Sequence, residues 1–133
     1  MAATADRIRI KRIYDDPSPE DGLRVLVDRL WPRGMSKERA KVDLWLKEVS
    51  PSADLRVWFG HDPEKWGEFR KRYRAELAGG AALDELRTLV REHSGRGKQG
   101  VTLLYGAKVT DNNHAIVLRE AVLDAGKAKA RER

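Results

Sequence analysis

The chain of 133 residues contains 41% hydrophobic and 36% charged residues, which is typical of one globular domain. It has no cysteine, and this excludes disulfides, thiol catalysis, iron–sulfur clusters and cysteine-based zinc sites. The net charge is +6, but half of it comes from residues 127–133, which hold four basic residues and one acidic residue. The rest of the chain is only mildly basic, which is weak support for nucleic-acid binding.

The sequence has no signal for export or membrane insertion. No apolar run approaches the roughly 20 residues that cross a bilayer, and residues 1–6 lack the regions of a signal peptide. We therefore expect a cytoplasmic protein that does not bind membranes. We expect residues 1–6 to be disordered, residues 7–126 to form a single domain and residues 127–133 to form a basic tail.

Three segments are predicted to be strands. Residues 7–14 alternate basic and apolar side chains, as in a strand with one solvated face. Residues 23–30 contain a Val-Leu-Val run and residues 101–105 read Val-Thr-Leu-Leu-Tyr, and such runs are typical of parallel strands covered on both faces. Residues 15–22 have the composition of a loop.

The region between the second and third strands is predicted to be largely helical. Ser36 can cap a helix over roughly residues 37–49, although the alternation within Val42–Leu46 also fits a short edge strand. Ser50-Pro51 places a capping oxygen before a proline, which predicts another helix start.

Three further helices are predicted with clearer signals. Asp62-Pro63 begins a helix over residues 62–78 with an apolar stripe. A similar stripe covers residues 83–90 in a helix that ends near residues 95–100, and the last helix starts around residues 111–113. The element order favours an α/β fold, with a small parallel or mixed sheet and helices packed on it in a single compact domain.

The residues after the predicted strands suggest a site, because ligands in open α/β sheets bind beyond the carboxyl ends of the strands. The second strand is followed by Asp28-Arg-Leu-Trp-Pro-Arg-Gly34 and the third by Gly106-Ala-Lys108. Arginine can hold a carboxylate or phosphate with two hydrogen bonds, aromatic rings can stack on a flat ligand, and a helix N-terminus favours anions. These features predict a small anionic ligand with a carboxylate, phosphate or ring, whose binding residues are Arg29, Trp31, Arg33, Tyr105, Lys108 and Asn113.

Each of these residues also has a structural explanation. Arg29 could pair with Asp28 or with the acidic residues at 15 and 16, Trp31 could cover the core, and Asn113 could cap its helix. For one residue taken alone the structural explanation is favoured. The group as a whole favours a ligand, because its basic residues outnumber what Asp28 alone can neutralise, with Asp15 and Asp16 as the main counterweight.

Whether the protein is an enzyme stays open. The sequence has no Gly-x-Ser-x-Gly motif, no phosphate-binding loop and no dinucleotide fingerprint, and no cofactor is indicated. His114 is the candidate general acid or base, because the ordinary pKa of histidine lies near neutrality. His61 and His114 lack the spacing of a metal site, so no metal is expected. His93 falls at a helix end, where histidine commonly contacts terminal carbonyls.

Two alternative functions remain. The basic residues of helix 62–78 could contact nucleic acid, although the interspersed acidic residues are more typical of a solvated helix face. The tryptophans could instead form a protein interface, which an exposed Trp58 would favour.

Five motifs along the chain carry a family resemblance: Asp28-Arg-Leu-Trp-Pro-Arg-Gly34, Trp45-Leu-Lys-Glu48 with Pro51-Ser52, Leu55-Arg-Val-Trp-Phe-Gly-His-Asp62, residues 69–77, and Leu103-Leu-Tyr-Gly-Ala-Lys108 with Asn113-His114. Together they resemble the YeaO-like proteins, domain of unknown function 488. The resemblance implies a compact bacterial α/β domain of uncharacterised function, and it adds Arg56 and His61 to the expected ligand-binding residues. Val109 stands where the family often has an acidic residue, so no carboxylate role is expected there.

Overall fold

The computed structural model describes residues 7–95, 97–108 and 112–131, with side chains as far as Asp124. In these ranges the chain forms strands β1 (Ile8–Arg12), β2 (Leu23–Leu26), β3 (Leu44–Trp45) and β4 (Val101–Tyr105). The helices are α1 (Lys37–Ala40), α2 (Ala53–Phe59), α3 (Trp66–Leu77), α4 (Ala81–His93) and α5 (His114–Arg131). Short 3-10 turns occupy Pro19–Asp21, Lys47–Val49 and Pro63–Lys65.

The four strands form one parallel sheet in the order β1-β4-β2-β3. The last strand, β4, lies between β1 and β2, so that Leu103 is opposite Ile10 on one side and Val25 on the other. This arrangement confirms the α/β fold and brings the carboxyl ends of β2 and β4 side by side. The residues that follow these two strands must therefore be neighbours in space.

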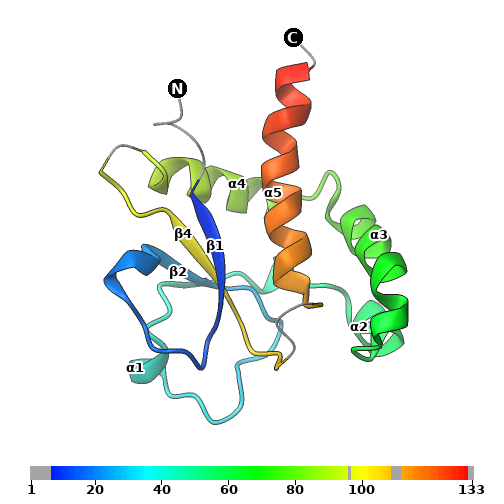
Figure 1. Ribbon diagram of the computed structural model, residues 1–133, viewed down its shortest axis with the longest axis horizontal. Helices are drawn as coiled ribbons and strands as arrows, with labels where there is room; N and C mark the ends of the chain where they lie inside the picture. The colour runs from blue at the N-terminus through cyan, green and yellow to red at the C-terminus, as the bar shows by residue number, and fades with distance from the viewer. Residues whose placement is uncertain (1–6, 96, 109–111, 132–133) are drawn as a thin grey trace.

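The two faces of the sheet are covered differently (Figure 1). Alternate strand residues such as Val25 and Leu103 pack with α2 to α5 in the larger core. Their neighbours Leu26 and Leu104 face the other way, into a smaller core that includes Ala40 of α1. The helices thus form one layer on the sheet, while α1 and the long connections cover the opposite face.

The segment from Ser36 to Ser52 differs from the helix predicted over residues 37–49. Ser36 does cap a helix, but α1 ends at Ala40 because Lys41 takes a left-handed backbone conformation, with φ of 49°. The alternation at residues 42–46 instead produces β3 at the sheet edge. The predicted cap at Ser50 is wrong, since Ser52 caps α2 and the Ser50 hydroxyl donates to the carbonyl of Lys47.

The later helices agree better with the sequence. Asp62 accepts a hydrogen bond from the Glu64 N–H at the start of the 3-10 turn that leads into α3, and His93 Nδ1 lies 2.8 Å from the carbonyl oxygen of Leu89. Helix α5 continues to Arg131, so it includes most of the segment expected as a basic tail. Residues 1–6 lie outside the described ranges. Among the described helices, none has the length and apolar character required to span a bilayer.

Candidate ligand-binding pocket

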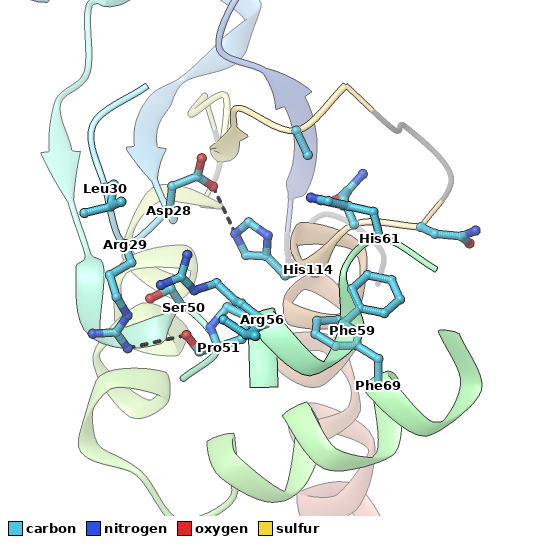
Figure 2. A pocket seen from close by; sticks show the side chains of 14 residues that line it. Asp28, Arg29, Leu30, Ser50, Pro51, Arg56, Phe59, His61, Phe69 and His114 are labelled. Carbon is cyan, nitrogen blue, oxygen red and sulfur yellow. Dashed lines mark hydrogen bonds and ion pairs between the residues drawn. The ribbon is translucent and has the colours of Figure 1, made fainter. Parts of the chain in front are cut away.

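A pocket with a volume of about 350 Å³ lies at the carboxyl ends of β2 and β4, on the helical side of the sheet (Figure 2). Residues 28–30 follow β2, Ala107 follows β4, and residues 112–114 form the start of α5. Residues 50–51 come from the entry to α2, residues 56, 57 and 59 from α2 itself, residue 61 from the turn after it, and Phe69 from α3. The pocket is therefore where the parallel-sheet rule places a ligand.

His114 and Asp28 form the polar centre of the pocket. Nε2 of His114 lies 3.1 Å from the Val27 carbonyl oxygen and also 3.1 Å from Oδ1 of Asp28. The contact with Asp28 has the distance of an ion pair without hydrogen-bond geometry, and Oδ1 has no other partner among the described residues. Because a carbonyl oxygen only accepts, Nε2 carries a hydrogen here, and Nδ1 is the ring nitrogen that remains for a ligand.

Asp28 contacts Gly106 and Trp45 in addition to His114. Its Oδ2 accepts the backbone N–H of Gly106 at 2.9 Å, and its backbone carbonyl accepts from Nε1 of Trp45 at 2.7 Å. The side chain is 20% exposed and that of His114 is 15% exposed, so both are largely shielded from water. The ends of β2 and β4, the short strand β3 and the start of α5 are therefore joined through one aspartate.

Two arginines line the pocket without a carboxylate partner in the described part of the chain. Arg29 donates from Nη2 to the carbonyl of Pro51 at 3.4 Å, and the Arg56 guanidinium forms no hydrogen bond or ion pair with a described group. The alternative in which Arg29 pairs with Asp28 is not formed, because the Asp28 carboxylate contacts Gly106 and His114 instead. Both arginines are exposed and can reorient toward a ligand.

The N-terminus of α5 forms one edge of the pocket. Oδ1 of Asn113 accepts from the N–H groups of Ala115 at 3.0 Å and Ile116 at 3.3 Å, so Asn113 caps the helix. The structural explanation for this residue therefore holds. The cap also fixes His114 at the first position of the helix, where the helix dipole is positive.

Aromatic rings form the apolar wall of the pocket. The rings of Phe59 and Phe69 stack with centroids 4.3 Å apart, and the His61 ring lies 5.9 Å from that of Phe59. His61 is exposed and has a φ of 59°, a left-handed conformation that is uncommon for residues other than glycine. Together with Gly60, which caps α2 in the same conformation, it turns the chain so that His61 lines the pocket.

Tyr73 supports this wall from behind. Its hydroxyl donates to the Val49 carbonyl, just before the segment that borders the pocket, and its ring lies 6.4 Å from that of His114. Burial, with smaller contributions from Glu76 and Asp28, raises the pKa of Tyr73 well above its ordinary value. The phenol therefore keeps its proton and remains a donor at physiological pH.

The pocket brings together five of the nine residues expected from the sequence: Arg29, Arg56, His61, Asn113 and His114. Trp31 belongs to the smaller core on the opposite face, where its Nε1 donates to the carbonyl of Met35 at 2.6 Å. Tyr105 is buried in the larger core. Arg33 and Lys108 are exposed and do not line the pocket. Proximity to a strand end was thus insufficient, because side chains near it also point to the opposite face, as Trp31 does, or are buried in the core, as Tyr105 is.

Residues that the sequence did not select are also present. Asp28 was treated only as a counterion, although its place at the end of β2 was a usable signal. Phe59, Phe69, Leu30 and Val57 could not be recognised, because apolar helix and loop residues are usually core or surface. Among the described residues, no group of three histidine or acidic side chains could hold a metal ion.

Comparison with known proteins places the chain in a family. The family model DUF488-N3i, described as "Inactive DUF488-N3 subclade", matches residues 7–133. The uncharacterized protein Rv3073c of Mycobacterium tuberculosis is 44% identical over 114 residues, covering 86% of this chain and 92% of its own. The uncharacterized protein YeaO of Escherichia coli is 41% identical over 121 residues, covering 85% and 94%. No solved structure matches. The resemblance inferred from the motifs is confirmed, and the chain belongs to the DUF488-N3i family of YeaO-like proteins.

Proposed function

We propose that this protein binds a small organic anion, with a phosphate or carboxylate group, in the pocket between Asp28, Arg56 and His114. One observation carries the proposal. Arg29 and Arg56 come from different elements, line the same pocket and lack a carboxylate partner among the described residues. An anion would supply the missing charge, and guanidinium groups can hold it with paired hydrogen bonds.

The surroundings of the arginines support this chemistry. The capped N-terminus of α5 contributes positive potential at one edge of the pocket. The stacked rings of Phe59 and Phe69 offer an apolar surface for the rest of the ligand. Pockets of this kind combine a few polar groups with mostly apolar walls.

The description of the family supports binding of a ligand without its chemical conversion. The matching family model is described as an inactive subclade, and the related proteins are named only as uncharacterized. In this proposal, Asp28 acts by positioning His114, whose fixed Nε2–H leaves Nδ1 for the ligand.

Catalysis by His114 is a second candidate function, favoured by its contact with Asp28. A carboxylate beside an imidazole is the arrangement that orients a histidine for proton transfer. The hypothesis requires that a bound ligand be converted. Prolonged incubation with each ligand found below, followed by mass spectrometry, tests it: product formed by the wild type and not by His114→Ala supports catalysis, and unchanged ligand contradicts it.

The nucleic-acid alternative is less well supported. Basic residues of α3 have acidic partners: Arg70 pairs with Glu120 at 2.6 Å and Arg72 with Glu68 at 2.8 Å, and Arg74 donates to Asp124. A helix face neutralised in this way has little charge left for phosphates. Trp58 is only partly exposed and lies under Lys65 and Arg72, which weakens the interface alternative as well.

The proposal is tested by thermal shift. Wild-type protein, Arg29→Gln and Arg56→Gln are heated with phosphates, nucleotides, carboxylates and short DNA at low and moderate salt. A ligand at 100 times its dissociation constant adds about 2.7 kcal/mol to stability, which is readily measured. A salt-tolerant shift with a small anion that weakens in both variants supports the proposal. A shift with DNA alone, limited to low salt, or no shift at all, contradicts it.

A further inference from the structure

The rim of the pocket has an unusual surface composition. Among the described side chains only two large hydrophobic ones are strongly exposed, Leu30 at 69% and Val57 at 82%. Both line the same pocket, although they lie on different elements, the segment after β2 and helix α2. Isolated exposed hydrophobic residues are ordinary on protein surfaces, whereas these two line one and the same pocket.

The sequence neighbours of these residues are the two arginines without carboxylate partners. Leu30 follows Arg29 and Val57 follows Arg56, so each side of the pocket carries a guanidinium next to an exposed apolar side chain. The stacked rings of Phe59 and Phe69 line the same pocket. Its lining therefore combines charged and apolar side chains.

We infer that the ligand is an amphipathic anion: a carboxylate or phosphate with an apolar chain that extends from the aromatic wall across Leu30 and Val57. The inference rests on the proposed function, because it assigns the charged group of the ligand to Arg29 and Arg56. A hydrophilic anion such as free phosphate would satisfy the arginines but would leave the apolar rim exposed to water. An apolar chain would cover it, and each buried methylene contributes to affinity.

A series of straight-chain carboxylates tests this. Butanoate, hexanoate, octanoate and decanoate are titrated by calorimetry below their micellar concentrations, with inorganic phosphate as the anion without an apolar part. Burial of a methylene stabilises by about 0.8 kcal/mol, which corresponds to roughly a fourfold gain in affinity per methylene. We expect affinity to rise from butanoate to decanoate by up to about fourfold for each added methylene. 1-Octanol, which has the same chain without the charge, should bind at least about tenfold more weakly than octanoate, since it lacks the charged hydrogen bonds.

Variants separate the two claims. Leu30→Ser combined with Val57→Ser should reduce the ratio of octanoate to butanoate affinity by roughly tenfold, whereas Arg56→Gln should weaken every anion in the series. Both apolar substitutions are at exposed positions, and circular dichroism checks the fold. If phosphate binds but chain length has no effect, the inference is overturned and the proposed function stands. If 1-octanol binds as tightly as octanoate, the charged group adds no affinity, and both the inference and the proposed function are contradicted. If neither phosphate nor any carboxylate binds, the proposed function itself fails.

Discussion

The backbone N–H of Gly106 donates to Oδ2 of Asp28 at 2.9 Å, and a Cβ atom on Gly106 would lie 3.0 Å from the same oxygen. Glycine at this position thus lets the end of β4 approach the end of β2 closely enough to hold the carboxylate. Asp28 in turn contacts His114. The close approach of the two strand ends therefore positions Asp28, and Asp28 positions His114 in the pocket.

Gly106→Ala should lower stability and displace Asp28. The methyl group forces the carboxylate to move by a few tenths of an ångström and weakens its hydrogen bond, at a cost of about 1 kcal/mol. Gly67→Ala in α3 is the control, because no atom lies within 4 Å of its added Cβ and alanine favours the helix, which predicts a gain of up to about 1 kcal/mol. Urea denaturation measures both. Changes of the same sign would contradict the role given to Gly106.

Tyr73→Phe should destabilise the protein by about 1–3 kcal/mol. The substitution keeps the ring but leaves the buried carbonyl of Val49 without its donor. Tyr14→Phe is the matched control: its hydroxyl donates to the carbonyl of Arg33 at 2.7 Å at an exposed site, where water can replace it. We expect the control to change stability by less than about 0.5 kcal/mol. Equal losses in denaturation experiments would show that the Tyr73 hydroxyl has no special role.

Glu76 of α3 should stabilise the start of α2, although the two lie far apart in the sequence. Its carboxylate accepts from the Ser52 N–H at 2.9 Å and from the Ser52 hydroxyl at 2.6 Å, at the start of the helix that carries Arg56. Glu76→Ala removes both bonds and should cost about 0.5–2 kcal/mol, the range for loss of a helix cap. Glu85→Ala on the exposed face of α4 is the control and should be nearly neutral. We expect amide hydrogen exchange within α2 to become faster in Glu76→Ala and to stay unchanged in Glu85→Ala. Unchanged exchange in α2 of Glu76→Ala would show that Glu76 does not stabilise this helix.

Asp21 should make stability depend on pH in the acid range. Its carboxylate is buried with Arg24, 2.5 Å away, and both residues are 4% exposed. Burial alone would raise the pKa of Asp21, but hydrogen bonds from the Ser18 N–H, Lys11 and Arg24 outweigh it and lower the pKa below its ordinary value of 3.8. This stabilisation is therefore fully present above pH 3.8 and is lost as the pH falls through the lowered value in the folded state.

Asp21→Asn tests this dependence. The variant leaves the Arg24 charge buried without its carboxylate, which should cost about 3–5 kcal/mol at neutral pH, and its stability should fall less steeply on acidification than that of the wild type. Asp16→Asn, at an exposed position, should behave as the wild type. Denaturation curves between neutral pH and about pH 3 provide the comparison. Parallel loss of stability in wild type and Asp21→Asn would refute the assignment.

Most of the fold could be predicted from the sequence because its signals are local. Two strands can be recognised from the apolar runs at residues 23–26 and 101–105, and α3 from apolar residues that recur every three to four positions. Each of these patterns is complete within a short stretch of sequence. The region from Ser36 to Ser52 was harder, since the two-residue strand β3 depends on pairing with β2, 19 residues earlier in the sequence. Which serine caps α2 depends equally on a tertiary contact, the one with Glu76.

The candidate site could be located but not completed. The rule for strand ends led to Arg29, His114 and Asn113. It could not separate the two faces of the sheet, so it also selected Trp31, and it could not show that Tyr105 is buried in the larger core. Arg56 and His61 lie on α2 and the turn after it, far from any strand end, and only the family motif pointed to them. Phe59 and Phe69 give no sequence signal that separates a pocket wall from a core.

The central claim is that the pocket, rather than basic surface residues, binds the anion. The most direct test is to follow amide NMR shifts during titration with inorganic phosphate at about 150 mM salt, because interactions of surface charges are largely screened at this salt concentration. The account predicts shifts at Arg29, Arg56 and His114, weakened in Arg56→Gln and retained in Arg33→Gln, since Arg33 is an exposed arginine outside the pocket. Shifts confined to α3, or equal loss in both variants, would contradict it.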